Sequence, residues 1–269
     1  MKKLFIISPF LFVIACNDTG YNPVNQNNDS SSNTRARKQA DANRSSFDGG
    51  SCSKLIFFQP GAEIEATSYN KEGKEISKQY TKILSVTNEG GFIVANVEGR
   101  DTETGGEQKT TTVNYSYKCD GNKIYFDLAS MFRTAEKEQD ATFESSLIEY
   151  PINVKEGEVL PDATGKMSSV KDGKKTSMNF IYKNRKVEGK EDVTTAAGTW
   201  SCYKITNSVQ VEMDIPGMDE ASKEMMKKMQ QEMKNTTTTW FSSDFGIVKM
   251  EMYMNGKLVS RNEVTAAKR

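Results

Sequence analysis

The stretch TTTVNYSYK, residues 110–118, decides the fold class of this chain. Its apolar residues Val113, Tyr115 and Tyr117 alternate with Asn, Ser and Lys. A period of two is typical of a β-strand that buries one face. After a short turn that contains glycine, KIYFD at 123–127 continues the pattern. The stretch therefore predicts two successive strands of an antiparallel sheet.

The same pattern of short apolar runs separated by turn residues extends over most of the chain. Strands are predicted at 54–58, 62–69, 77–86, 92–98, 110–118, 123–127, 146–150, 166–170, 177–182, 185–195, 199–213, 236–241, 246–254 and 258–265. Glycine-centred turns at Gly73, Gly173 and Gly256 are typical of hairpins. The charged stretch 133–145 predicts a loop or a short helix. The whole pattern predicts a mainly β fold, built as a curved antiparallel sheet or half-barrel.

One segment, DEASKEMMKKMQQEMKN at 219–235, interrupts the strands with an amphipathic helix of about four turns. Asp219 and Glu220 at its start suit the positive end of a helix. Its methionines are Met218, Met225, Met226, Met229 and Met233. These side chains could pack on the sheet as ordinary core, form a lid over an apolar cavity, or bind copper(I). We keep the lid as the candidate ligand site, and we expect no metal.

The first residues predict export. Two lysines precede an apolar run that ends at Ala15, which is typical of a signal peptide over residues 1–15. The run is shorter than the roughly 20 residues that cross a bilayer. Val13, Ile14, Ala15 and Cys16 resemble the lipobox of bacterial lipoproteins. That resemblance implies cleavage before Cys16 and attachment there of acyl chains such as palmitate. An ordinary secretory signal with an incidental cysteine is the alternative.

Residues 16–50 are rich in Asn, Ser, Asp and Gly, with almost no large apolar side chains. Such a segment cannot bury enough surface to offset its ordering entropy, so we expect a flexible tether. Its typical end-to-end distance is about 30 Å. The β-rich domain then occupies residues 51–269. We therefore expect a protein anchored to a bacterial membrane in the cell envelope, on the periplasmic or surface side of the outer membrane.

Composition excludes several functional classes. Lys and Arg number 36, as do Asp and Glu, so no basic excess suggests a nucleic-acid partner. The chain has no histidine, which excludes Ser-His-Asp triads and histidine-based zinc sites. Carboxylate pairs such as Glu63 with Glu65, or Glu149 with Asp162, could hydrolyse glycans, but no spacing singles out one pair. We expect a protein that is not an enzyme and has no cofactor.

Three cysteines remain besides Cys16, namely Cys52, Cys119 and Cys202. An exported protein can oxidise one pair and leave one thiol free. Spacing does not fix the connectivity. We expect a disulfide between Cys52 and Cys119, because both lie in the N-terminal half, and we expect Cys202 to be a packed or disulfide-bonded residue and not a reactive thiol.

The C-terminal part carries a family resemblance in AAGTWSCYKI at 196–205 and TTWFSSDFGIVKMEMYMNGKLVSRNEVTAAKR at 238–269. Both resemble the DUF3108-like, or TapB-type, family of bacterial envelope proteins, whose function is unknown. The matching residues are Gly198, Thr199, Trp200, Cys202, Tyr203, Lys204, Ile205, Trp240, Phe241, Gly246, Val248, Lys249, Asn255, Gly256 and Lys257. The resemblance covers 50–269 and implies a sheet of the lipoprotein-carrier type, in which a half-barrel holds acyl chains under helical lids. The methionine-rich helix has no counterpart in the pattern.

Three functions remain open at this point. The first is a lipid-anchored protein that binds an apolar ligand, an acyl chain or a lipoprotein, in its half-barrel. The second is an interaction protein that docks another envelope protein. The third is a carboxylate-based glycan hydrolase. We expect the first, because the methionine face and the carrier-like resemblance agree.

Overall fold

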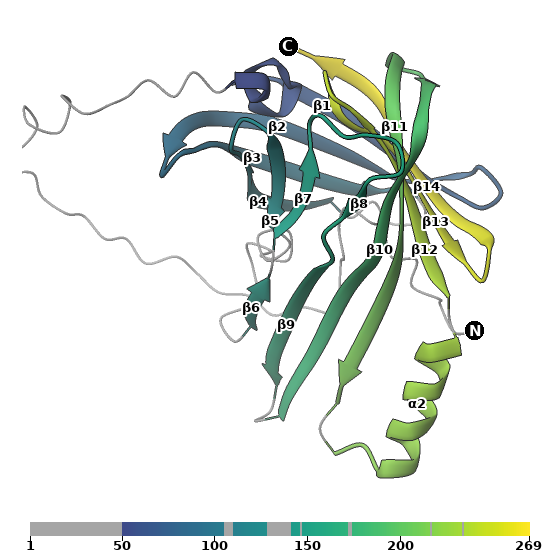
Figure 1. Cartoon of the computed structure of the whole chain (residues 1–269). Helices are drawn as coiled ribbons and strands as arrows, with labels where there is room; N and C mark the ends of the chain where they lie inside the picture. Colours follow the sequence, from purple (N-terminus) through teal and green to yellow (C-terminus); the bar gives the residue numbers. More distant parts are fainter. Residues whose placement is uncertain are drawn as a thin grey trace, which may run out of the picture.

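Over the residues that it describes, the computed structural model shows one 14-stranded antiparallel sheet that curls strongly and does not close into a barrel (Figure 1). The structure describes residues 50–104, 110–127, 141–145, 147–171, 174–215, 217–232 and 234–269. The strand order is β6-β9-β10-β11-β12-β13-β14-β1-β2-β3-β4-β5-β7, and β8 pairs with β10 beside this path. Most neighbours in the sheet are also neighbours in sequence, as expected for a meander. The predicted fold class, a curved antiparallel sheet with one inserted helix, is confirmed.

The elements have the following bounds. The first strands are β1 (Glu63–Asn70), β2 (Glu75–Glu89), β3 (Phe92–Glu103), β4 (Thr110–Cys119), β5 (Lys123–Asp127), β6 (Ala141–Ser145) and β7 (Leu147–Pro151). The others are β8 (Val159–Leu160), β9 (Ala163–Lys171), β10 (Lys174–Thr195), β11 (Gly198–Asp214), β12 (Asn235–Ser242), β13 (Gly246–Met254) and β14 (Lys257–Lys268). The helices are the 3-10 turns η2 (Gly50–Lys54) and η3 (Ile56–Phe58) and the α-helix α2 (Glu220–Glu232).

Three predictions about individual elements were wrong. The run at 54–58 is not a strand but part of two 3-10 turns, because its four apolar residues from Leu55 onward are all buried, which a one-faced strand cannot achieve. The two strands predicted at 177–182 and 185–195 form the single strand β10, which continues through an irregularity at Asn184 with a positive φ of 55°. Part of the charged stretch, 141–145, is a strand.

Several predictions fall outside the described residues. These are the signal peptide, the lipid site at Cys16, the tether up to residue 49, the turn at 172–173, the part 133–140 of the predicted loop or short helix, Ser146 and Met233.

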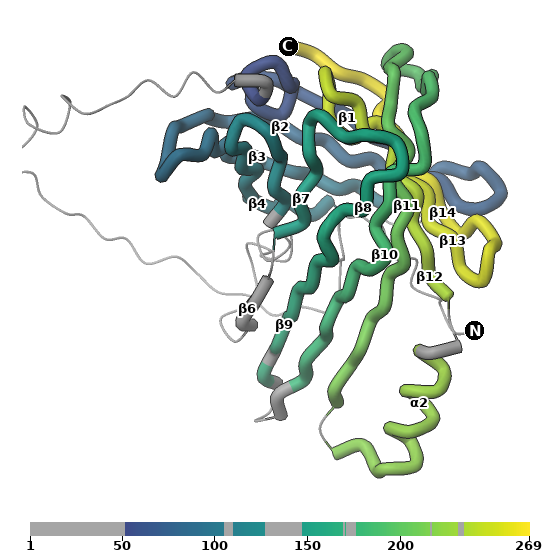
Figure 2. The backbone as a smooth tube through the Cα atoms, in the orientation of Figure 1, coloured from purple at the N-terminus to yellow at the C-terminus, as the bar shows by residue number. Residues whose placement is uncertain are grey.

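The sheet curls far enough for one of its ends, β7, to meet its middle (Figure 2). β7 is the last strand of the order, yet Tyr150 on β7 stacks on Phe241 of β12 with ring centres 5.7 Å apart. Just after each strand, the Ser243 hydroxyl donates a hydrogen bond of 2.6 Å to the Ile152 carbonyl. The interior between these strands is the main core.

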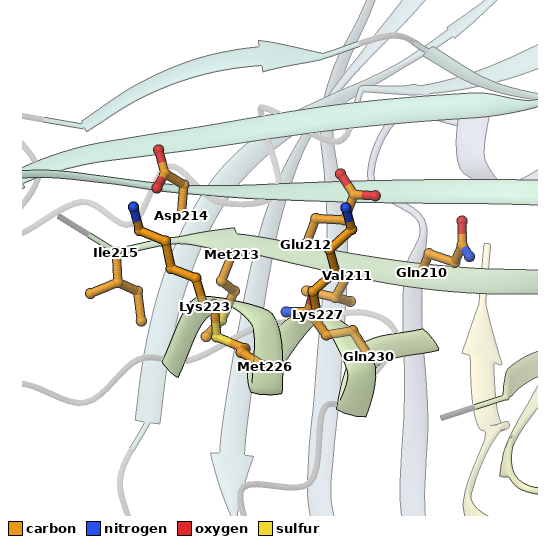
Figure 3. A pocket seen from close by; sticks show the side chains of 10 residues that line it. All are labelled: Gln210, Val211, Glu212, Met213, Asp214, Ile215, Lys223, Met226, Lys227 and Gln230. Carbon is orange, nitrogen blue, oxygen red and sulfur yellow. The ribbon is translucent and has the colours of Figure 1, made fainter. Parts of the chain in front are cut away.

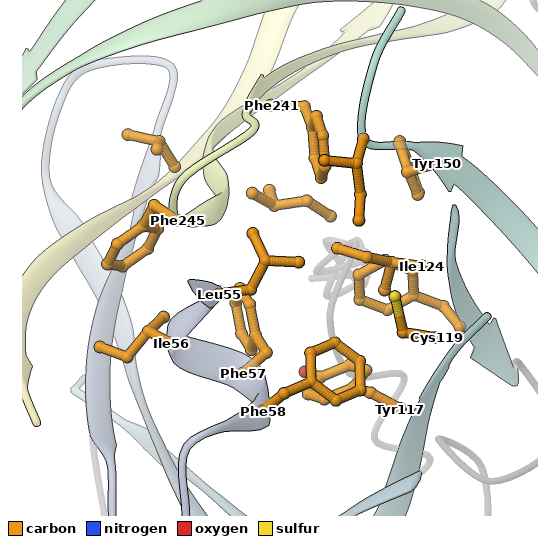
Figure 4. Packing of buried hydrophobic residues seen from close by; sticks show 14 of the residues in the cluster. Leu55, Ile56, Phe57, Phe58, Tyr117, Cys119, Ile124, Tyr150, Phe241 and Phe245 are labelled. Atoms are coloured by element: carbon orange, nitrogen blue, oxygen red, sulfur yellow. The ribbon is translucent and has the colours of Figure 1, made fainter. Parts of the chain in front are cut away.

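The two 3-10 turns fill this interior (Figure 4). The ring of Phe57 lies edge-on to Tyr117 at 5.1 Å and to Phe245 at 6.1 Å. Phe57 also packs directly on Gly246, whose φ of 115° and missing side chain allow this close approach. A disulfide joins Cys52 of η2 to Cys119 at the end of β4, the pair expected from the sequence. The N-terminal turns are thus fixed covalently and by packing inside the curl.

Candidate functional site

A buried arginine marks the boundary of the main core. Arg185 on β10 is 1% exposed. Its guanidinium donates hydrogen bonds of 2.9 Å to the Pro161 carbonyl and 2.7 Å to the Glu149 carbonyl. It also lies over the Tyr150 ring, 5.1 Å from the ring centre. On one side of Arg185 along β10 lies Val187, in the main core; on the other side Tyr182 still packs against that core, and Phe180 and Met178 lie beyond it.

Past this point β9, β10 and β11 project together as an extension of the sheet (Figure 1). Their register aligns apolar residues across the three strands: Met178 on β10 pairs with Met167 on one side and Met213 on the other. One face of the extension consists of Ala163, Gly165, Met167, Met178, Phe180, Tyr182, Val209, Val211 and Met213. We name this face the apolar extension.

The two faces of this projection differ sharply in chemistry. The opposite face carries polar residues, as in the aligned set Lys166, Asn179 and Glu212. Such alternation is expected where one face of an antiparallel sheet turns toward the core. In the apolar extension Phe180 and Val209 are buried, while the side chains of all three methionines are only half-buried. Methionine is flexible and polarizable, so this face can adapt to apolar molecules of different shape.

Buried polar side chains form a band on the same face of the sheet, which starts on β11 and continues across the strands that follow it in the sheet. Asn207, two residues from Val209, accepts a hydrogen bond of 2.7 Å from the Thr237 hydroxyl on β12. On β14 the Asn262 amide donates to the Ser68 hydroxyl at 2.9 Å and to Gln79 at 3.2 Å. We name these residues, together with Asp101 on β3, the polar band. The concave side of the sheet therefore has a filled core, a polar band and an apolar extension.

Asp101 has an unusual environment within the polar band. Its side chain is 6% exposed, and burial raises the pKa of its carboxyl, although hydrogen bonds from Ser77 and Gln79 oppose the shift. One of its carboxylate oxygens has no hydrogen-bond partner in the structure. A buried carboxyl in such a place favours a ligand group that donates hydrogen bonds.

The methionine-rich helix α2 packs along the edge of β11 (Figure 3). A groove of about 380 Å³ separates them, lined by Gln210, Val211, Glu212, Met213, Asp214, Ile215, Lys223, Met226, Lys227 and Gln230. Of the five methionines expected to form a lid, Met226 faces this groove. Met225 and Met229 are 68% and 51% exposed, Met218 is half-buried on the preceding turn, and Met233 is not described. The lid role of the helix stays a prediction.

Three of the four carboxylates considered for hydrolysis, Glu63, Glu65 and Glu149, pair with lysines. Glu149 pairs with Lys123 at 2.9 Å, and Glu63 pairs with Lys82 at 3.4 Å. Within the described ranges, no three Asp, Glu or Cys side chains gather as a metal site.

Cys202 is a buried free thiol. The part of the chain that the structure describes contains no helix long and apolar enough to cross a membrane.

The apolar extension was not predicted, although its strands were. The usable signal is the period-two run of Met178, Phe180 and Tyr182 on one strand and Val209, Val211 and Met213 on another. Only the register between strands shows that these runs share one face with Met167.

Two solved structures share this fold at 18% sequence identity. One is a protein from Bacteroides fragilis, classed as exported and described as having a YmcC-like fold; the match covers 80% of this chain and 100% of that chain, with a TM-score of 0.59. The other is a protein from Parabacteroides distasonis, classed as a lipoprotein; the match covers 80% and 98%, with a TM-score of 0.60. A comparison with curated proteins finds no match. The family described as DUF3108-like matches residues 59–264, so the chain belongs to the DUF3108-like family.

Proposed function

We propose that this protein is a lipid-anchored, non-enzymatic component of the bacterial cell envelope that holds an acyl chain against its apolar extension. The lipobox-like sequence that ends at Cys16 supports the anchor. The structural neighbours support it as well, since one is classed as exported and one as a lipoprotein. A periplasmic or surface position on the outer membrane is the corresponding location.

The observation that carries the ligand proposal is the half-buried methionine row of Met167, Met178 and Met213, outside the main core. The apolar extension measures roughly 14 Å along the strands and about 10 Å across them, from ordinary strand dimensions. Each methylene buried there contributes about 0.8 kcal/mol. The polar band beside it offers hydrogen bonds to a head group, the usual combination in a ligand site.

The anchor is tested by metabolic labelling with radioactive palmitate. We expect the full chain to carry the label and to sediment with membranes, and we expect Cys16→Ala to lose both properties. A Cys202→Ala variant is the matched control and keeps both. Label retained in the Cys16→Ala variant would contradict the proposed anchor.

The ligand is tested in living cells fed a fatty acid with a diazirine near its methyl end. After irradiation, we expect crosslinks in peptides from β9, β10 and β11, separate from acylation at Cys16. Met178→Asp places a charge on the apolar extension and should reduce these crosslinks about tenfold, whereas Asn179→Asp on the opposite face should not. If crosslinks are as abundant in Met178→Asp as in wild type, the apolar extension is excluded as the acyl-binding site.

A second candidate function, docking of another envelope protein, has one observation in its favour. Met225 and Met229 expose apolar surface on the same side of α2, one turn apart. If the fatty-acid experiment gives no crosslinks, the exposed surface of Met225 and Met229 is tested next. A Met225→Asp and Met229→Asp double variant would then be compared with wild type for the size of the complex extracted from membranes.

A further inference from the structure

One stretch of β11 has a strand neighbour on only one side. β12 begins at Asn235, which pairs with Val209, whereas β10 stays paired with β11 as far as Asp214. Within the described part of the chain, no strand pairs with Gln210–Asp214 on the β12 side. The cause is local: the chain leaves β11, forms α2, and returns to the sheet only at Asn235.

The helix leaves a groove along this free edge instead of closing it. Five residues of strand span roughly 17 Å, and the 13 residues of α2 span about 20 Å, so helix and edge match in length. Val211 and Met213 give the groove an apolar side to which α2 adds Met226. Lys223 and Lys227 extend from the helix toward the side of β11 that carries Asp214 and Glu212 (Figure 3).

We infer that this groove receives an extended peptide segment of another protein, which adds to the sheet as a strand beside Gln210–Asp214. A free strand edge presents N–H and C=O groups spaced to pair with an extended backbone. Addition of a strand to an exposed sheet edge is a recurrent mode of peptide recognition, in which backbone pairing gives affinity and pockets for alternate side chains give specificity. The partner segment carries apolar residues at every second position, facing Val211, Met213 and Met226, and polar residues between them.

The chemistry of the groove favours a peptide over an acyl chain. An acyl chain would cover the free edge of β11 without pairing its N–H and C=O groups, and burial of unpaired polar groups is costly. It would also desolvate Glu212 and Lys227 at the rim. An added strand pairs the edge and leaves the charged rim in water. This inference does not depend on acyl binding by the apolar extension.

The test uses the full chain, extracted with its anchor and placed in lipid nanodiscs. A displayed library of linear eight-residue peptides is selected on it, and the best peptide is synthesised for fluorescence anisotropy. We expect selected sequences to have apolar residues at alternate positions. Met226→Asp should weaken binding at least about tenfold, or about 1.4 kcal/mol, whereas Met225→Asp, next to it on the helix and exposed, should not.

Backbone pairing is then tested separately from side-chain contact. N-methylation of the peptide, one residue at a time, should weaken binding about tenfold or more at alternate residues and little at the residues between. If selection on wild type enriches no peptides relative to selection on Met226→Asp, the inference is overturned, and α2 serves only to cover the free edge of β11. Equal tolerance of N-methylation at every position would also overturn it, as would fatty-acid crosslinks confined to 223–230. The fatty-acid crosslinking of Met178→Asp is a separate measurement. A negative result for one proposal therefore does not affect the other.

Discussion

The guanidinium of Arg185 lies 5.1 Å from the centre of the Tyr150 ring, at the point where the curled sheet meets itself. Arg185 is on β10 and Tyr150 is on β7, at opposite parts of the strand order. The same guanidinium donates to the carbonyl of Glu149, next to Tyr150 in β7. A buried cation held by carbonyls and a ring therefore fastens the last strand to the strand that carries the apolar extension.

Replacing this arginine should loosen the curl. Arg185→Met keeps much of the side-chain volume but removes both hydrogen bonds and leaves the two carbonyl acceptors unpaired. We expect a loss of about 3 kcal/mol in the free energy of unfolding, because hydrogen bonds from charged donors each contribute roughly 1.5–3 kcal/mol. Urea unfolding followed by tyrosine and tryptophan fluorescence measures this loss.

The control for Arg185→Met is Arg100→Met on β3. The Arg100 side chain is 50% exposed, and it pairs with Glu98 at 2.6 Å. An exposed pair of this kind contributes at most about 1 kcal/mol. Equal losses in the two variants would show that burial gives Arg185 no special role.

The disulfide between Cys52 and Cys119 should be a major source of stability. It closes a loop over a sequence separation of 67 residues. The chain-entropy account gives about 4 kcal/mol for such a loop, and typical measured values are roughly 2–4 kcal/mol. We expect Cys52→Ser with Cys119→Ser to lose about that much. Dithiothreitol should lower wild type to the same level and leave the double variant unchanged; a further loss in the variant would contradict this assignment.

The sequence predicts elements well where local pattern and environment agree. β4 keeps period-two alternation over its length, and β11 keeps it from Ile205 to Met213, after a change of phase between Cys202 and Ile205; the structure has strands in both places. The run KLIFF at 54–58 misleads because four consecutive apolar residues suit a buried strand as well as a turn. Its conformation is decided by the open interior of a curled sheet, which short turns fill and a further strand does not.

The candidate site was less accessible to sequence reasoning than the fold. Met167, Met178 and Met213 come from three strands, and their alignment depends on register, which strand patterns taken singly do not contain. The methionines of α2 are easier to recognise, because their helical spacing is visible in a single window of the sequence. Arg185 was missed for a related reason, because nothing local distinguishes a buried arginine from the exposed ones around it.

Cys202 should be unreactive in the folded protein. It is buried, and burial, together with nearby Asp192 and Glu191, raises the pKa of its thiol to about 12. At pH 8 almost no thiolate is present, and the thiolate is the nucleophile. We expect no alkylation of Cys202 by iodoacetamide in native buffer, and full alkylation in urea at the same pH without reductant. Peptide mapping measures both, and rapid native modification would show that the sheet opens around β11.

Asp101 and Asp120 should give stability opposite dependences on pH. Burial raises the pKa of Asp101 above the ordinary 3.8. For Asp120, burial also acts to raise the pKa, but hydrogen bonds from the Tyr125 hydroxyl and from the backbone N–H groups of Asn122 and Lys123 outweigh it and lower the pKa. The raised group favours the unfolded chain once the pH exceeds about 4, because ionisation is then easier after unfolding. The lowered group stabilises the folded chain above that pH, and its contribution disappears as the pH falls through its lowered pKa.

The measurement is urea unfolding of Asp101→Asn and Asp120→Asn between pH 3 and pH 7, each compared with wild type at the same pH. We expect the Asp101→Asn difference to become more favourable as the pH rises, since asparagine removes the growing cost of burying a charge. We expect the Asp120→Asn difference to become less favourable over the same range, since wild type gains from the ionised carboxylate. Parallel curves for the two variants would mean that the polar band around Asp101 is hydrated enough to accept the charge.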